Sequence, residues 1–308
     1  METPKRPDEA MMDGEPNPGT PPVKQVQTWI TPLLLMICIG IHIGLLMRDD
    51  RESWEALARF GYLPAARVWE GGWWALVSSA FVHLEIWHVA FNMYWLWMLG
   101  RRLENAIGWW RYLAFYLVAA FVSSAFQLGV SGETGIGASG AVYALFGFMW
   151  VTRQRYPDFA EVIDARTVNL FMVWLVGCIV VTQLKIFNVG NAAHVSGLIF
   201  GAAVGEVFAG RHRKPALAGS AALVLLSLVP LFWCPWSVPW LQTKAYKAHA
   251  AEQYESAIGW YDRVLDKDPQ NAWAYFNRGS ARQSTGDMEG ARQDLEKAFT
   301  IDPSMKTE

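Results

Sequence analysis

Hydrophobic residues are grouped in long blocks along this chain, with polar stretches between them. The seven blocks cover residues 29–47, 87–100, 110–130, 139–152, 167–187, 194–209 and 216–236. A helix needs about 20 predominantly apolar residues to cross a bilayer, so the pattern predicts an all-α bundle of membrane-spanning helices. The blocks 139–152 and 194–209 are short, and each begins with a polar residue.

Lysine and arginine are concentrated in alternate loops between these blocks. They are Lys5, Arg6 and Lys24, then Arg101, Arg102 and Arg111, then Arg153, Arg155 and Arg166, then Arg211, Arg213 and Lys214. Positive loops stay on the cytoplasmic side, so the N-terminus is predicted inside and the long first loop, 48–86, outside. Seven spans then place the C-terminus outside. If the block 216–236 were re-entrant instead, the C-terminal region would be cytoplasmic.

The two ends of the chain differ from the membrane core at 29–210 and from the added span at 211–239. Residues 1–28 are rich in Pro, Gly and charge, which predicts a disordered cytoplasmic tail. Residues 240–308 are polar and repetitive, since Asp268-Pro269 recurs 34 residues later as Asp302-Pro303. A 34-residue period with a closing proline is typical of tetratricopeptide repeats, which bind proteins or peptides on a concave surface.

Composition adds a few limits. The formal net charge of −2 gives no indication of a nucleic-acid partner, and the three cysteines all lie in apolar blocks, which argues against a disulfide framework. The N-terminal stretch contains acidic residues and lacks the character of an organelle transit peptide. A bacterial inner membrane therefore fits best.

Ser139 is the first candidate for chemistry. Gly137-Ala138-Ser139-Gly140 opens the fourth block, and Arg153 marks its cytoplasmic end. Fourteen residues at about 1.5 Å each span roughly 21 Å, which places Ser139 about 10 Å below the outer surface of a core about 30 Å thick. Polar groups are costly in hydrocarbon and are functional candidates there. A serine hydroxyl needs a neighbouring base to act as a nucleophile.

His194 is the candidate base, because histidine titrates near neutral pH. It opens the sixth block and is followed by glycines at 197, 201 and 205. Small residues at this spacing allow close helix approach in lipid, and the fourth block has its own small face at Gly140, Ala144 and Gly147. If the two faces meet, Ser139 and His194 come together. Separately, a helix-capping serine and a structural histidine are the plainer interpretations.

His88 and Asn92 lie four residues apart and therefore share one face of the second block. Both side chains can donate hydrogen bonds, as an oxyanion hole requires. A metal site built from His83, His88 and His194 is the alternative, but the five-residue spacing of the first two does not place them on one helical face. No metal or cofactor is predicted.

These motifs together resemble the rhomboid family of intramembrane serine proteases over about residues 29–210. The resemblance is carried by Gly137-Ala138-Ser139-Gly140, by Ala193-His194 with its glycine-spaced helix, and by His88-Val89-Ala90-Phe91-Asn92. It implies a Ser139–His194 dyad, oxyanion stabilisation by His88 and Asn92, and stacking of Tyr143 on the histidine. The first loop departs from the family pattern at Trp74-Ala75.

The resemblance implies a serine endopeptidase that cleaves transmembrane segments of protein substrates entering past the fifth block. The repeat region is expected either to recruit a protein partner or to mediate self-association. Two alternatives remain: a non-catalytic relative that binds membrane helices in quality control, and a transporter. A transporter predicts an internal repeat among the spans, and the sequence shows no such pair.

Overall fold

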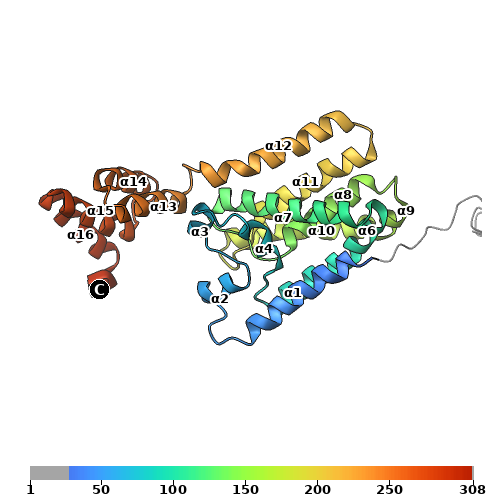
Figure 1. Ribbon diagram of the computed structural model, residues 1–308, viewed down its shortest axis with the longest axis horizontal. Helices are drawn as coiled ribbons and strands as arrows, with labels where there is room; N and C mark the ends of the chain where they lie inside the picture. Colours follow the sequence, from blue (N-terminus) through green and yellow to red (C-terminus); the bar gives the residue numbers. More distant parts are fainter. Residues whose placement is uncertain (1–27, 307–308) are drawn as a thin grey trace, which may run out of the picture.

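The computed structural model describes residues 28–306, so the prediction for the N-terminal tail lies almost wholly outside the described residues. Within this range the chain is helical and has no β-strand, as the sequence predicts (Figure 1). The long membrane-core helices are α1 (Ile30–Leu46), α5 (Ile86–Trp95), α7 (Trp109–Ser131), α8 (Ser139–Thr152), α10 (Ala165–Gln183), α11 (Asn191–Ala209) and α12 (Arg213–Phe232). The shorter ones are α2 (Trp54–Arg59), α3 (Ala65–Trp69), α4 (Ala75–Ser78), α6 (Arg101–Ile107) and α9 (Pro157–Val162).

Four of the described helices, α7, α10, α11 and α12, are long and apolar enough to cross a membrane, and α1 and α8 are shorter apolar helices. The bounds differ from the predicted blocks at several helix ends, of which three are the clearest. A π-helical turn at Leu96–Gly100 leads from α5 into α6, so the second helical segment runs on to Ile107. The fifth helix ends at Gln183 and the seventh at Phe232, because hydrophobicity continues past each helix end and does not mark where backbone hydrogen bonding stops.

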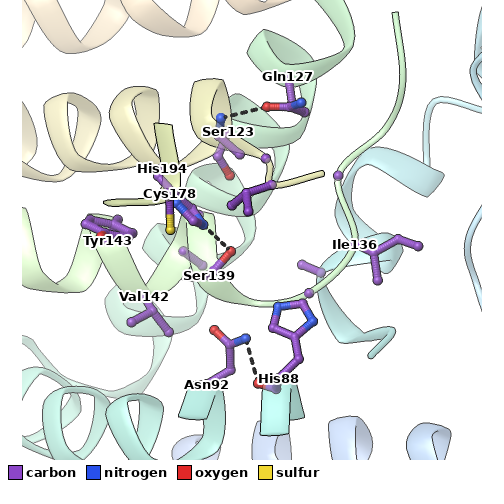
Figure 2. Close-up of a pocket in the computed structure, with 18 of the residues that line it drawn as sticks. His88, Asn92, Ser123, Gln127, Ile136, Ser139, Val142, Tyr143, Cys178 and His194 are labelled. Atoms are coloured by element: carbon purple, nitrogen blue, oxygen red, sulfur yellow. Dashed lines mark hydrogen bonds between the residues drawn. The ribbon is translucent and has the colours of Figure 1, made fainter. Parts of the chain in front are cut away.

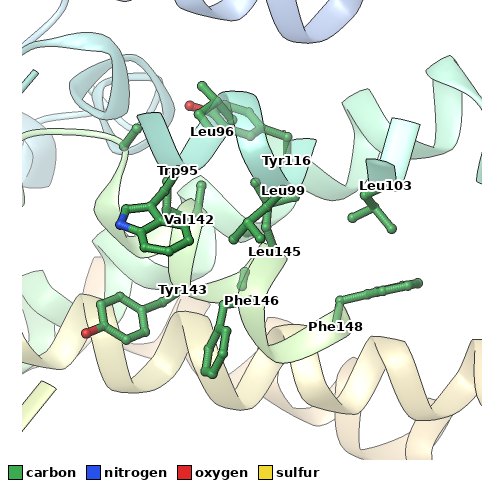
Figure 3. Close-up of a cluster of buried hydrophobic side chains, with 14 of the residues drawn as sticks. Trp95, Leu96, Leu99, Leu103, Tyr116, Val142, Tyr143, Leu145, Phe146 and Phe148 are labelled. Atoms are coloured by element: carbon green, nitrogen blue, oxygen red, sulfur yellow. The ribbon is translucent and has the colours of Figure 1, made fainter. Parts of the chain in front are cut away.

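The α8 helix is the centre of the bundle, and most of its side chains are buried. Figure 3 shows its residues Val142, Leu145 and Phe148 within a cluster that includes Leu99 and Tyr116. By contrast, α10 lies at the edge of the bundle and exposes most of its length. Its large apolar side chains therefore face the lipid, where hydrocarbon replaces protein as the packing partner.

Helices α8 and α11 pack backbone to backbone. A Cβ atom added at Gly197 would overlap the carbonyl oxygen of Gly140, and one at Gly201 would overlap that of Ala144. No side chain larger than hydrogen fits at these two positions, which is why the glycine face predicted for the sixth block is needed. This contact fixes the N-terminal ends of both helices relative to each other.

The N-terminus of α1 is capped by Glu104 of α6, which is buried. The carboxylate accepts hydrogen bonds of 2.9 Å from the backbone N–H groups of Trp29, Ile30 and Thr31, and one of 2.8 Å from the Thr31 hydroxyl. The first N–H groups of a helix have no intrahelical acceptor. A distant acidic residue therefore performs the capping role that a local side chain usually supplies.

The C-terminal region forms two helix pairs, α13 (Val238–Ala250) with α14 (Tyr254–Lys267), and α15 (Ala272–Thr285) with α16 (Met288–Ile301). The tail begins as a helix at Val238, slightly before the predicted boundary at 240. Arg278 joins the pairs, because it bonds to Asp294 of α16 at 2.6 Å and 2.8 Å and to Asp262 of α14 at 2.6 Å. Asp294 is buried, so this network is part of the repeat core.

The tail is attached directly to the membrane core. The indole N–H of Trp236 donates to the Gly129 carbonyl at the end of α7, at 2.6 Å, and Pro239 packs against Gly132. Trp69 of α3 donates to the Pro230 carbonyl at 2.9 Å and also packs against the apolar core of the tail. Helix α13 therefore lies beside helix α3 of the first loop, at one end of the membrane bundle, as Figure 1 shows.

Candidate active site

The loop that leads into α8 holds Ser139 in place. Gly137 has φ +99°, a left-handed conformation that glycine adopts without strain, and a Cβ atom there would overlap the His88 ring. The Gly137 N–H donates to the Ser79 carbonyl at 3.0 Å, and the Ala138 N–H donates to His83 Nε2 at 3.2 Å. Two hydrogen bonds from the first loop thus fix the backbone just before the serine.

Ser139 and His194 are in direct contact, at the N-terminal ends of α8 and α11. The distance from Ser139 Oγ to His194 Nε2 is 2.8 Å (Figure 2). The Tyr143 ring stacks on the imidazole with centroids 4.7 Å apart and planes 29° apart, and its hydroxyl donates to the Phe171 carbonyl of α10 at 3.1 Å. His194 Nδ1 has no hydrogen-bond partner among the described residues. The geometry is that of a serine–histidine pair oriented by packing.

His88 and Asn92 line the same cavity as Ser139. Figure 2 shows both beneath the serine, on α5. The Asn92 side-chain N–H donates to the His88 carbonyl at 3.0 Å, one turn back on its own helix. The sequence prediction treats both side chains as free donors, and the structure shows that one N–H of Asn92 is already used. The second N–H of the amide remains for an oxyanion.

Two further polar residues support the site. The Gln127 carbonyl oxygen on α7 accepts from the Ala193 N–H at 3.2 Å, immediately before His194. His83, predicted only as an alternative metal ligand, accepts from the Ala138 N–H, as described above. Gln127 stands out in the sequence as a polar residue within the third apolar block. Nothing in the sequence shows which backbone group its side chain reaches.

The cavity has a volume of about 400 Å³ and extends from the dyad towards α10. Aromatic side chains close the lateral side of the cavity. The ring centroids of Phe91 on α5 and Trp174 on α10 are 5.3 Å apart, and those of Trp87 and Phe187 are 6.3 Å apart. The Trp95 ring of α5 also packs edge-on against Phe171 of α10, with ring centroids 4.7 Å apart. The side wall of the cavity is therefore made of aromatic side chains.

The structure brings together Ser139, His194, Tyr143, His88 and Asn92 around one cavity. Four glycines set the backbone positions around the site and supply no reacting group: Gly137, Gly140, Gly197 and Gly201. Within residues 28–306, no group of three or more His, Cys, Asp or Glu side chains is arranged to hold a metal ion.

Two parts of this chain are similar to known protein families. Residues 70–211 match a Rhomboid domain, residues 248–286 a TPR repeat and residues 274–305 a Tetratricopeptide repeat. The membrane part of the chain is thus similar to a Rhomboid domain and its C-terminal region to TPR repeats, and the apolar helices support an integral membrane protein.

Similar proteins include Rhomboid protease GlpG from Yersinia pseudotuberculosis serotype I (strain IP32953). That protein is 34% identical over 175 residues, which cover 56% of this chain and 60% of the relative. Rhomboid protease GlpG from Yersinia enterocolitica serotype O:8 is 34% identical over 177 residues, with the same coverage. The chain therefore spans about 60% of the length of the curated relatives it matches.

Proposed function

We propose that this protein is an intramembrane serine endopeptidase that cleaves transmembrane segments of other membrane proteins. The observation that carries the proposal is the 2.8 Å contact between Ser139 Oγ and His194 Nε2 at the N-terminal ends of two apolar helices. A nucleophile within hydrogen-bond reach of a base is the arrangement that covalent catalysis needs. The similarity to rhomboid proteases supports the same activity.

The reaction follows from the roles of these groups. Ser139 Oγ attacks the scissile carbonyl while His194 Nε2 takes its proton, and the histidine then protonates the leaving amine. The Ser139 N–H, His88 and Asn92 donate to the oxyanion. Water hydrolyses the resulting acyl-enzyme, and Ser139 is regenerated. Tyr143 holds the imidazole in orientation by stacking, in place of a carboxylate.

The substrate class follows from the position of the site. A helical substrate keeps its carbonyls hydrogen-bonded, so a segment must unwind before Ser139 can attack it. Segments with small or helix-breaking residues near the outer surface unwind most easily. Entry past α10 would bring them to the cavity through the Phe91–Trp174 contact. We further propose a bacterial inner membrane, a cytoplasmic N-terminus, and a tail on the outer side with the first loop it contacts.

The test is cleavage of a labelled single-span substrate with a helix-breaking residue near its outer end, in proteoliposomes. Ser139→Ala and His194→Ala should each lower the rate at least about 1000-fold. Ser196→Ala is the matched control, because Ser196 lies on α11 near the histidine but donates to the Ala192 carbonyl of its own helix. Native-like cleavage by Ser139→Ala would refute the proposal.

A non-catalytic role is the second candidate, in which the fold binds membrane helices for quality control. It predicts that native protein and Ser139→Ala bind a membrane-helix substrate equally and that neither cleaves it. Co-purification of an uncut substrate with both forms, with no product over a panel of helix-breaking sequences, would favour this candidate over the protease.

A further inference from the structure

A second cavity lies at the opposite end of α8 from Ser139. Its volume is about 530 Å³, and it is open to the surface between the end of α8, helix α9 and the start of α10. The lining includes two charged side chains, Arg153 and Asp164, two amides, Gln154 and Asn169, and apolar groups such as Trp150 and Val168. The cavity thus combines one positive and one negative group with an apolar wall.

Arg153 provides the positive charge. It follows α8 directly, is half-buried, and makes no ion pair or hydrogen bond within the described part of the chain. By contrast, the neighbouring Arg155 donates to the Ala209 carbonyl at 3.3 Å. A guanidinium offers several N–H donors in a planar fork that matches a phosphate group. An unpaired arginine beside a cavity is therefore suited to bind phosphate.

Asp164 provides the negative charge. It is the N-cap of α10, and its Oδ1 accepts from the Thr167 N–H at 2.8 Å, which fixes the carboxylate at the edge of the cavity. The Arg166 backbone N–H also interacts with this carboxylate, and the charge of the Arg166 side chain adds electrostatic attraction. The carboxylate is exposed and keeps capacity to accept further hydrogen bonds, because an ionised carboxylate offers about four acceptor positions.

The apolar surroundings place this pair of charges where lipid headgroups lie. Trp150 stacks on Phe146 at 5.6 Å, and tryptophan is enriched at the membrane–water interface. From the cavity, the outer face of α10 continues with Leu170, 46% exposed, and Val173, 70% exposed. This face offers an apolar path for acyl chains next to the charged cavity.

We propose that this cavity binds a phospholipid with a phosphoethanolamine headgroup. Arg153 donates to the lipid phosphate, Asp164 accepts from the primary ammonium, and the acyl chains lie along α10. A headgroup with net negative charge leaves Asp164 facing an anion. A choline headgroup has no N–H to donate to the carboxylate. Of the ethanolamine, choline and glycerol headgroups, only phosphoethanolamine satisfies both charges with hydrogen bonds.

The experiment measures lipids retained by the full-length protein. The delipidated protein is incubated in mixed micelles with equal amounts of dioleoyl phosphatidylethanolamine, phosphatidylcholine and phosphatidylglycerol, and bound lipid is counted by native mass spectrometry. Phosphatidylethanolamine should be retained roughly threefold to tenfold over the other two, as expected for two exposed charge-assisted contacts. Because no cleavage is measured, this outcome is independent of the proposed protease activity.

Three variants assign the contacts. Asp164→Asn keeps a good N-cap residue and should abolish the preference for ethanolamine over choline. Arg153→Gln should lower the retention of all three lipids, and Arg153→Lys should lie between native and Arg153→Gln. Arg155→Gln is the control, because that side chain bonds outside the cavity. Melting temperatures confirm that each variant is folded.

Several results would overturn the proposal. These are equal retention of the three lipids by native protein, preferential retention of phosphatidylglycerol, and an Arg155→Gln effect as large as that of Arg153→Gln. Displacement of bound lipid by millimolar inorganic phosphate would also overturn it, because the cavity would then be a simple anion site. If Arg153→Gln fails to fold, retention by Arg153→Lys equal to that of native protein would count against the phosphate contact.

Discussion

Substitution of Gly197 by alanine tests whether the backbone contact between α8 and α11 sets the active-site geometry. The added methyl group would overlap the Gly140 carbonyl oxygen, one residue after Ser139. Restoring normal van der Waals contact requires the helices to separate by roughly 1 Å, and a misplacement of this size costs about 100-fold in rate. The 2.8 Å contact between Ser139 and His194 would open with it.

The stability change is expected to be moderate. Overpacking in a close-packed core typically costs about 1–3 kcal/mol, whereas glycine to alanine in a helix contributes about 1 kcal/mol in the opposite direction. The net destabilisation should therefore be roughly 0–2 kcal/mol, too small to unfold the protein. Loss of activity at nearly unchanged stability is the result that separates geometry from folding.

The assay is the initial rate of substrate cleavage in proteoliposomes, with thermal unfolding measured on the same samples. Gly219→Ala on α12 is the matched control, because a Cβ atom there meets no atom within 4 Å. It should keep the native rate and melt at the same or a slightly higher temperature. If Gly197→Ala cleaves within about threefold of the native rate, close glycine packing does not position the dyad and the reasoning fails.

Four further predictions concern single side chains. Tyr143→Ala should lower cleavage about tenfold or more by releasing His194, whereas Tyr143→Phe keeps the stacked ring and should stay within a few-fold of native. Glu104→Ala should destabilise the membrane core by about 2–4 kcal/mol in denaturant titrations, because it leaves two buried N–H groups and one partly buried N–H group without an acceptor. Arg278→Met should leave the buried Asp294 carboxylate with Arg282, at 3.0 Å, as its remaining ion-pair partner, and should make the tail more sensitive to limited proteolysis of the full chain. Burial lowers the pKa of His249 below its usual 6.5, so the unfolded tail binds a proton that the folded tail resists; tail stability should fall as pH drops below about 6.5, and His249→Gln should weaken this dependence.

Each of these expectations has an opposing result. Equal activity of Tyr143→Ala and Tyr143→Phe would remove the stacking role. An unchanged denaturation midpoint for Glu104→Ala would show that water replaces the carboxylate. Proteolysis of the Arg278→Met tail at the native rate would show that the network is dispensable. A steeper pH dependence in His249→Gln than in the native chain would contradict the direction assigned to that histidine.

Much of the fold follows from local patterns in the sequence. Apolar block length predicts the long helices, and the 34-residue period predicts the helical repeats, because both depend on residues close together in the chain. Helix ends are less predictable: the block 216–236 continues through Trp233, but the helix stops at Phe232. The cap of α1 by Glu104 joins residues more than 70 positions apart, and no local pattern indicates it.

The candidate site shows the same division. Glycine spacing in two separate helices correctly suggested a close approach, because a small face has few other uses in a lipid-embedded helix. The internal bond from Asn92 to His88 and the support of Ala138 by His83 depend on rotamers and on a loop conformation. Both hydrogen bonds are set by three-dimensional packing. Sequence spacing therefore predicts which residues belong to the site but does not predict their hydrogen-bond partners.

The junction between α7 and the tail fixes how far the repeats lie from Ser139. Trp236 bonds to the last turn of α7, and the loop that follows that turn leads directly to Ser139. The first helix of the repeat region, α13, begins at Val238, only two residues after Trp236. Under the proposed protease function, a protein bound to the repeats would be held at a set spacing from the serine. The number of residues between its bound segment and its membrane segment would then select which peptide bond reaches the cavity. The tail would then act as a ruler, and lengthening the partner's connecting segment by a few residues would move the cleavage point by the same number.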